Sequence, residues 1–318
     1  MDADKATPKG AFEDRFTGCL LGMVIGDALG VPRAYTSSAS DADTLHYRAR
    51  PPRDGEAEVP AGQYSVNTEL ALCLLESLAT SDGFVDPELA AYRFENAARQ
   101  SPYLGNTRET GAIMRAAETE AFQDGGGSMS TGGYAGPAAR VIPIALTHSL
   151  SELNVALVTR EVLRSVLVTD GDPEVVNGAL AVAHATRLTV RQEIPIELLV
   201  DEVLSLIDED DVARALRSGG AIDVGAGVAT VVARALHAFV LGEGDFARSL
   251  KIAFAGGGAT HLTGAITGAL CGAHLGARGI DQGLIDGLEG RAYVLMAAPA
   301  LLRTAQLRAG LLFQLRLR

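Results

Sequence analysis

Tryptophan is absent from the 318 residues of the sequence, and aromatic residues make up only 5% of it. With hydrophobic residues at 47%, the core must therefore be built mainly from alanine, valine, leucine and isoleucine. Charged residues, at 21%, lie in the globular range, and a chain of this length can bury a sizeable core. These proportions argue against a disordered protein.

Cysteines are also few, basic residues are outnumbered by acidic ones, and long apolar runs are rare. Cys19, Cys73 and Cys271 lie far apart, each within an apolar run, which favours buried thiols in a reducing compartment and predicts a cytoplasmic protein. A net charge of −12 disfavours nucleic acids and anionic membrane surfaces as partners. The apolar run 18–25 is far shorter than the roughly 20 residues that a membrane span needs.

Residues 1–12 mix both charges with proline and glycine and contain no apolar stretch, so we expect a flexible tail rather than a signal peptide. We expect the remainder, 13–318, to form a single domain. Its apolar residues recur at the helical period, and no segment alternates as a strand would. Helices are predicted over about 16–29, 69–79, 87–99, 108–121, 152–167, 174–188, 196–207, 228–241, 246–254, 261–276 and 284–304. The predicted fold class is all-α.

Two long irregular segments interrupt this pattern. Residues 125–136 read GGGSMSTGGYAG, and residues 47–63 are rich in arginine, proline and acidic residues. Long loops inside a compact domain often carry function, so ligand contacts are expected there first.

Five segments resemble, in chain order, motifs of the ADP-ribosylglycohydrolases, enzymes that remove ADP-ribose from modified proteins. The segments are 18–35 (GCLLGMVIGDALGVPRAY), 62–78 (GQYSVNTELALCLLESL), 133–146 (GYAGPAARVIPIAL), 165–174 (SVLVTDGDPE) and 256–273 (GGGATHLTGAITGALCGA). They are distributed over most of residues 16–276. The resemblance implies a single compact bundle of helices.

The sequence departs from the family pattern at its acidic positions. The glutamate of the first motif is replaced by Ala34. The Thr-Asp-Asp-Thr of the second motif reads Ser-Val-Asn-Thr, with Val66 and Asn67 at the two aspartates. The two aspartates of the closing motif fall on Ala259 and His261.

These departures bear on metal binding, because the resemblance implies two divalent cations that position the ribose and activate water. Such hard cations need oxygen ligands, and the five replacements offer almost none. We therefore expect no bound metal, no other cofactor and no catalytic residues, so metal-dependent hydrolysis should fail.

The resemblance also implies a nucleotide cleft. Its first loop matches Tyr103, Gly105 and Asn106, and its second loop matches Gly133, Tyr134 and Gly136. Before the last motif helix, backbone N–H groups of Gly257, Gly258 and Thr260 can cradle a phosphate. The alternative is that these glycines only permit a tight turn, and that both loops persist as scaffold.

For several other residues, a structural role competes with a functional one. His261 can fill the space of the missing metal, stack on a base or act as a lone metal ligand, and the filling role is favoured. Gly264, Gly268, Gly272 and Gly276 recur once per turn, which predicts a close approach between helices. Asp27 and Arg140 are expected to support helix ends.

The sequence therefore predicts a binding or regulatory protein without catalytic activity, with ADP-ribose, a related adenine nucleotide or a protein as its partner. One rival is a hydrolase that works without the metal pair through Asp170, Asp172, Glu69 or His261. However, an Asp-Gly-Asp-Pro turn before a helix is more often a cap than an acid pair. The other rival is a structural, crystallin-like protein.

Overall fold

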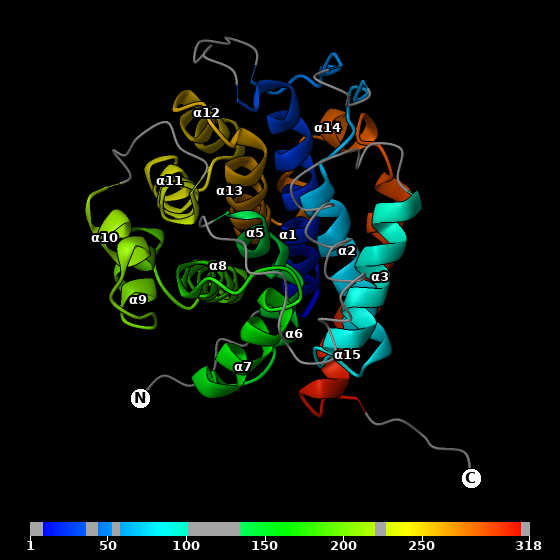
Figure 1. The fold of residues 1–318 in the computed structure, drawn as a ribbon, viewed down its shortest axis with the longest axis vertical. Coiled ribbons are helices and arrows are strands. Elements are labelled where there is room, and N and C mark those ends of the chain that lie inside the picture. Colours follow the sequence, from blue (N-terminus) through cyan, green and yellow to red (C-terminus); the bar gives the residue numbers. More distant parts are fainter. Residues whose placement is uncertain (1–8, 36–43, 53–57, 101–133, 220–226, 313–318) are drawn as a thin grey trace.

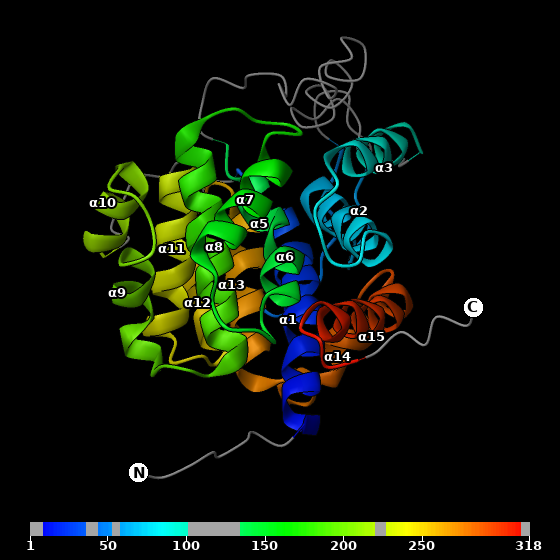
Figure 2. The same cartoon turned by 90° about the horizontal axis from the view of Figure 1, so that it is seen from below.

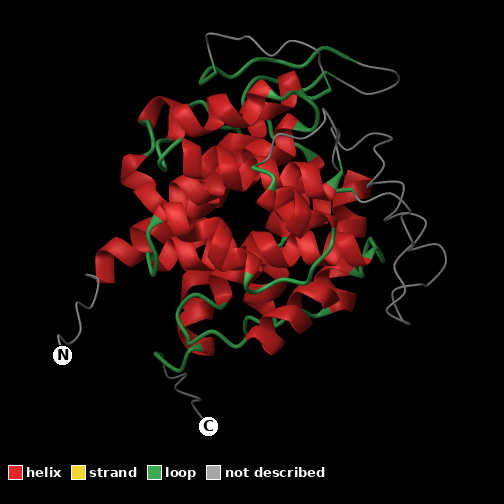
Figure 3. Ribbon diagram, turned by 90° about the vertical axis from the view of Figure 1, so that its left-hand side faces the viewer, coloured by secondary structure: helices red, strands yellow, loops and turns green. Residues whose placement is uncertain are grey.

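The computed structural model describes residues 9–35, 44–52, 58–100, 134–219 and 227–312. Helices dominate these residues, and Figure 3 shows no strand among them. The extended pairings within the described ranges are two isolated antiparallel bridges, Arg50 to Val59 and Tyr134 to Gly227. The all-α fold class is confirmed. None of the described helices is long and apolar enough to cross a membrane.

The helices begin and end as follows. The first half contains α1 Lys9–Gly30, η1 Val31–Arg33, α2 Val66–Thr80, α3 Pro87–Gln100, α5 Gly136–Arg140, α6 Ile142–Thr147 and α7 Val155–Val166. The second half contains α8 Pro173–Arg191, η2 Ile196–Leu198, α9 Leu199–Leu204, α10 Asp211–Arg217, α11 Val228–Leu241, α12 Phe246–Ala255, α13 Thr260–Leu275, η3 Ala277–Gly279, α14 Gln282–Asp286 and α15 Arg291–Arg308.

Helices α1 and α13 pack against each other at the centre of the bundle (Figures 1 and 2). Glycines face glycines along this antiparallel contact: Gly18 meets Gly272, Gly22 meets Gly268, and Gly26 meets Gly264. A Cβ placed on Gly22 would lie only 2.0 Å from the carbonyl oxygen of Gly268. The predicted close approach of helices is therefore confirmed for Gly264, Gly268 and Gly272.

The other helices flank this central pair. Helix α8 contacts α5, α6, α7, α9 and α11, while α2 contacts α3 and α15 (Figure 2). Most of the buried side chains are aliphatic, and Phe16, Phe94 and Phe239 are the largest fully buried aromatic ones. The aliphatic core expected from the composition is present.

Several helix bounds differ from the sequence prediction. Helix α1 begins at Lys9, inside the segment expected to be a tail, and Phe12 packs against the core and against the Phe16 ring. The helix predicted over 284–304 is wrong as a single unit, because α14 ends at Asp286 and Gly290 adopts a left-handed backbone, φ 67°, before α15. The helix predicted over 108–121 lies outside the described residues.

Candidate functional site

Three segments that resemble family motifs meet at one end of the bundle. Ser65, before α2, donates a hydrogen bond of 2.8 Å from Oγ to Oδ2 of Asp27 on α1. At the start of α13, the Thr260 hydroxyl donates to the carbonyl oxygen of Gly30 over 2.8 Å. The N–H of Tyr35 donates to the Gly258 carbonyl oxygen over 2.8 Å. The end of α1 and the starts of α2 and α13 are thus bonded together.

The second glycine-rich loop joins this cluster through Tyr134. The Asn67 side chain donates from Nδ2 to the Tyr134 hydroxyl over 3.2 Å. A Cβ on Gly136 would lie 2.4 Å from Oδ1 of Asn67 and 2.4 Å from the Tyr134 ring, so only glycine fits there. Two predicted ligand contacts, Tyr134 and Gly136, therefore lie directly beside Asn67, a lost metal position.

Asp27 is the carboxylate that lies within this cluster, and it is fully buried. Burial raises the pKa of Asp27 to about 6, although the polar groups of Thr68 and Ser65 lower it. Within the described residues, Asp27 Oδ1 and Thr68 Oγ1 have no hydrogen-bond partner. Both atoms can therefore accept a polar group of a ligand or water.

His261 lies at the first turn of α13 and is 7% exposed. Its ring meets the Tyr35 ring edge-on, with centroids 5.8 Å apart. Burial, with a contribution from the Arg50 charge, lowers the pKa of His261 to about 4. The imidazole is thus neutral at pH 7, and its Nδ1 has no hydrogen-bond partner in the described part of the chain.

The described residues at the five replaced positions do not fit a pair of divalent cations. Ala34, Val66 and Ala259 are buried and carry no ligand atom, and Asn67 offers one neutral oxygen in place of a carboxylate. Among the described residues, no cluster of three or more histidine, cysteine, aspartate or glutamate side chains can hold a metal ion. Hard divalent cations need several oxygen ligands, and the Asp27 carboxylate alone does not supply them.

The Gly256–Gly258 loop uses much of its backbone for internal bonds. The N–H of Gly257 donates to the Phe254 carbonyl oxygen over 3.0 Å, and the N–H of Thr260 donates to Gly258 over 2.9 Å. Gly257 and Gly258 have φ angles of 62° and 71°, a region that favours glycine. The Arg234 guanidinium donates to the Gly257 carbonyl oxygen over 2.8 Å. These contacts support the tight-turn reading, and the expected phosphate cradle remains a prediction.

The remaining predicted residues fall elsewhere. Tyr103, Gly105, Asn106 and Gly133 lie outside the described residues. Arg140 donates to the carbonyl oxygen of Ser165 over 3.2 Å and to the Thr169 hydroxyl over 2.8 Å. It thus supports the end of α7, in line with the helix-end role expected for it.

Asp170 and Asp172 behave as turn and cap residues. Asp170 Oδ1 accepts from the N–H of Asp172, and Asp172 Oδ1 accepts from the N–H of Glu174 at the start of α8, each over 2.9 Å. The capping interpretation is confirmed. Sequence reasoning missed Tyr35, Arg50 and Arg234 as neighbours of the site. Arg50 and Arg234 lie outside the five motif segments, so no motif pointed to them.

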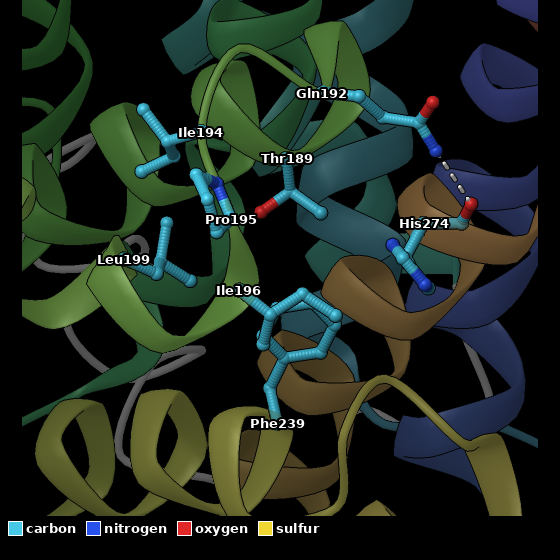
Figure 4. A pocket seen from close by; sticks show the side chains of 8 residues that line it. All are labelled: Thr189, Gln192, Ile194, Pro195, Ile196, Leu199, Phe239 and His274. Atoms are coloured by element: carbon cyan, nitrogen blue, oxygen red, sulfur yellow. Dashed lines mark hydrogen bonds between the residues drawn. The ribbon is translucent and has the colours of Figure 1, made fainter.

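A pocket of about 270 Å³ lies at the opposite end of α13 (Figure 4). It is lined mainly by apolar side chains, and the Gln192 amide donates to the His274 carbonyl oxygen over 3.1 Å at its rim. His274 stands fourteen residues after Thr260, roughly 20 Å along the helix. The pocket therefore lies apart from the place where the motif segments meet. We take that meeting point as the candidate functional site.

Comparison with known proteins shows the family to which the chain belongs. A family model described as ADP-ribosylglycohydrolase matches residues 8–310. ADP-ribosylhydrolase ARH3 of Gallus gallus is 27% identical over 213 residues, which cover 61% of this chain and 55% of the relative. An uncharacterised protein of Archaeoglobus fulgidus is 32% identical over 211 residues, which cover 63% of each chain. The chain thus matches somewhat more than half the length of these relatives.

A solved structure titled "ADP-ribosylglycohydrolase-related protein complex" superimposes with a TM-score of 0.78. The match covers 93% of this chain and 99% of the other at 24% sequence identity. At this identity the likeness shows the fold alone.

Proposed function

The chain belongs to the ADP-ribosylglycohydrolase family, and we propose that it is a member without metal-dependent hydrolysis that binds ADP-ribose or a related adenine nucleotide. The main support for this proposal is that the hydrogen bonds joining the motif segments are intact, whereas the acidic metal ligands of the family are replaced. Ser65, Thr260 and Tyr35 hold the motif segments together. The positions between them carry alanine, valine, asparagine and histidine in place of acids. Binding can survive such a change, whereas two-metal chemistry cannot.

The groups that remain suit a polar, uncharged part of a ligand such as a ribose. Asp27 Oδ1, Thr68 Oγ1 and His261 Nδ1 are buried polar atoms without a hydrogen-bond partner among the described residues. A buried polar atom of this kind costs stability unless a hydroxyl or water satisfies it. The rings of Tyr35 and Tyr134 add surfaces on which a planar base can stack.

Calorimetric titration with ADP-ribose tests the proposal. We expect binding with the same affinity in excess EDTA, because no metal bridges the ligand. Tyr134→Ala should weaken binding at least about tenfold, since it removes a ring and a hydroxyl beside Asn67. Tyr92→Ala is the matched control, because Tyr92 lies 63% exposed on α3 and outside the site. Equal affinities for the two variants would place the ligand elsewhere.

Activity and binding together separate the rivals. Release of ADP-ribose from a modified peptide in the presence of EDTA would replace the proposal with the metal-free hydrolase. Failure to bind any adenine nucleotide would favour the structural, crystallin-like alternative. Binding without release is the result that we expect.

A further inference from the structure

Tyr35 is an exposed aromatic residue on a strained backbone at the candidate site. Its side chain is 58% exposed, and its φ of 58° lies in the left-handed region that favours glycine. The hydrogen bond from its N–H to the Gly258 carbonyl oxygen, over 2.8 Å, holds the backbone in this conformation. Strained residues of this kind cluster at ligand sites, which indicates a role in binding for the Tyr35 ring.

The Tyr35 ring lies beside the buried imidazole of His261. The two ring planes make an angle of 61°, and their centroids are 5.8 Å apart. The end of α1 approaches His261 closely because Gly30 has no side chain, since a Cβ there would lie 2.6 Å from the His261 Cα. His261 is only 7% exposed, and its Nδ1 has no hydrogen-bond partner among the described residues. An exposed ring and a buried, unsatisfied polar atom therefore lie side by side.

The chemistry of the replaced positions selects the kind of group that fits here. Ala34, Val66 and Ala259 are buried and apolar, and the His261 imidazole is neutral at pH 7. Such surroundings suit a planar, uncharged heteroaromatic ring, whose face can pack on a tyrosine ring. An imidazole nitrogen donates or accepts a hydrogen bond according to its tautomer, and the edge of a nucleobase offers partners of both kinds.

We propose that Tyr35 and His261 form a subsite for the base of a nucleotide or nucleoside, at the place where the family resemblance puts metal ligands. This inference rests on the proposed function and adds which part of the ligand enters here. The base packs on the Tyr35 ring and turns its polar edge toward His261 Nδ1. Asp27 Oδ1 and Thr68 Oγ1 remain for the hydroxyl groups of the sugar. Tyr35 thus keeps its strained backbone because its ring binds the ligand.

Calorimetric titration with adenosine tests the subsite, because adenosine carries a base and a ribose but no phosphate. We expect the wild type to bind it. Tyr35→Gly should weaken this binding at least about tenfold, since the stacked ring is lost. Its melting temperature should not fall, because a φ of 58° suits glycine. Tyr35→Phe keeps the ring and should bind within about twofold of the wild type. A lower melting temperature with unchanged affinity in Tyr35→Gly would show a structural role and overturn the proposal.

Glu243→Gly is the matched control for the backbone. Glu243 is exposed after the end of α11, and its φ of 55° is also in the left-handed region. The substitution therefore relieves the same kind of strain outside the site. It should leave both the melting temperature and the affinity for adenosine no lower than in the wild type.

Two substitutions of His261 test its contact with the polar edge of the base. Both remove the imidazole, but His261→Asn keeps a polar atom near the position of Nδ1, whereas His261→Leu does not. His261→Leu should weaken adenosine binding about fivefold or more, and His261→Asn should recover part of this loss. Equal losses in the two variants would show that Nδ1 makes no hydrogen bond to the base.

Titration with ADP-ribose separates the subsite from the proposed function. If ADP-ribose binds equally to the wild type, Tyr35→Gly and His261→Leu, the subsite is rejected and the proposed function stands. If adenosine binds in a way that depends on Tyr35 but ADP-ribose does not bind, the subsite stands and the proposed function is rejected. A wild type that binds neither compound would reject both.

Discussion

Ser65 preserves the geometry of the site while its neighbours have changed. Its Oγ accepts from the N–H of Asn67 over 3.2 Å, capping α2, and donates to Asp27 over 2.8 Å. These two bonds fix the first turn of α2 against the end of α1, whatever stands at position 66. A carboxylate returned to that position would therefore point into the same space as Val66 does now.

At the residue scale we predict that five substitutions create a divalent-cation site. They are Ala34→Glu, Val66→Asp, Asn67→Asp, Ala259→Asp and His261→Asp. The carboxylates would supply the oxygen ligands that magnesium requires. Without metal they would repel one another, so the variant should be less stable in EDTA and should regain stability when magnesium is added. Thermal unfolding with and without magnesium measures both effects.

The unmodified protein is the control for this experiment, and its melting temperature should not respond to magnesium. If it binds two equivalents of metal, the proposed loss of metal chemistry is wrong. If the five-fold variant folds but ignores magnesium, the five positions do not converge as the family resemblance implies.

At the scale of helices, the contact between α1 and α13 depends on backbone meeting backbone. A Cβ on Gly268 would lie 2.1 Å from the Gly22 carbonyl oxygen, and neither backbone can move without shifting its helix. Gly268→Ala should therefore destabilise the fold, on the order of 3 kcal/mol, despite the better helix propensity of alanine. Urea unfolding followed by circular dichroism gives the free energy of unfolding.

Gly283→Ala is the matched control for this prediction. Gly283 is exposed on α14, and a Cβ there would meet only the Asp281 side chain, at 2.9 Å. Its stability should stay within about 1 kcal/mol of the wild type. Equal effects of the two substitutions would show that the glycine contact does not hold the central pair together.

Long periodic helices were predictable from the sequence, whereas short ones were not. Helices α3, α8, α11 and α13 agree closely with the predicted ranges, because each buries a face over three or more turns. Helices α5, α6 and α10 were missed as separate elements, since five to seven residues are too few for a period to show. Pro137 and Pro143 at the starts of α5 and α6 were the available signals.

The site was predictable only where motifs covered it. Asn67, Tyr134, Gly136 and His261 were named from the motif segments, and the structure brings them to one end of the bundle. The contact of Tyr134 with Asn67 joins residues 67 apart in the chain, which no local pattern predicts. The same holds for Arg234, which reaches the Gly257 carbonyl oxygen from α11.

At the scale of the whole molecule, buried histidines make the free energy of unfolding depend on pH. Burial lowers the pKa of His148 to about 3 and those of His184 and His261 to about 4, from an ordinary value of 6.5. His148 Nε2 is paired with the Arg308 guanidinium over 3.1 Å, which requires a neutral imidazole. Both ring nitrogens of His184 are buried and unpartnered in the described chain. His148 and His184 lie close enough for their charges to interact, and Arg187 lies beside both, while His261 lies at the start of α13. Protonation of any of the three opposes folding.

We predict that the free energy of unfolding falls as the pH is lowered from 7.5 to 5. In this range the histidines of the unfolded chain, with pKa values near 6.5, become protonated. The buried histidines of the folded chain stay neutral. Asp27 opposes the trend, because its folded pKa of about 6 lies above its ordinary 3.8. It releases a proton on unfolding, but three histidines outweigh one carboxyl group. Urea unfolding at a series of pH values measures the slope.

Two variants test the histidine and Asp27 contributions separately, because the two change stability with pH in opposite directions. His184→Leu removes one proton-binding group from the unfolded chain, so the slope should decrease by up to about 1.4 kcal/mol per pH unit. At pH 7 this variant should be no less stable than the wild type, because it replaces a buried polar ring without partners. Asp27→Asn removes the opposing group, so stability should fall more steeply below pH 6 than in the wild type. A free energy of unfolding that is flat from pH 7.5 to 5, or a wild-type slope in His184→Leu, would mean that these histidines are accessible to protons in the folded protein.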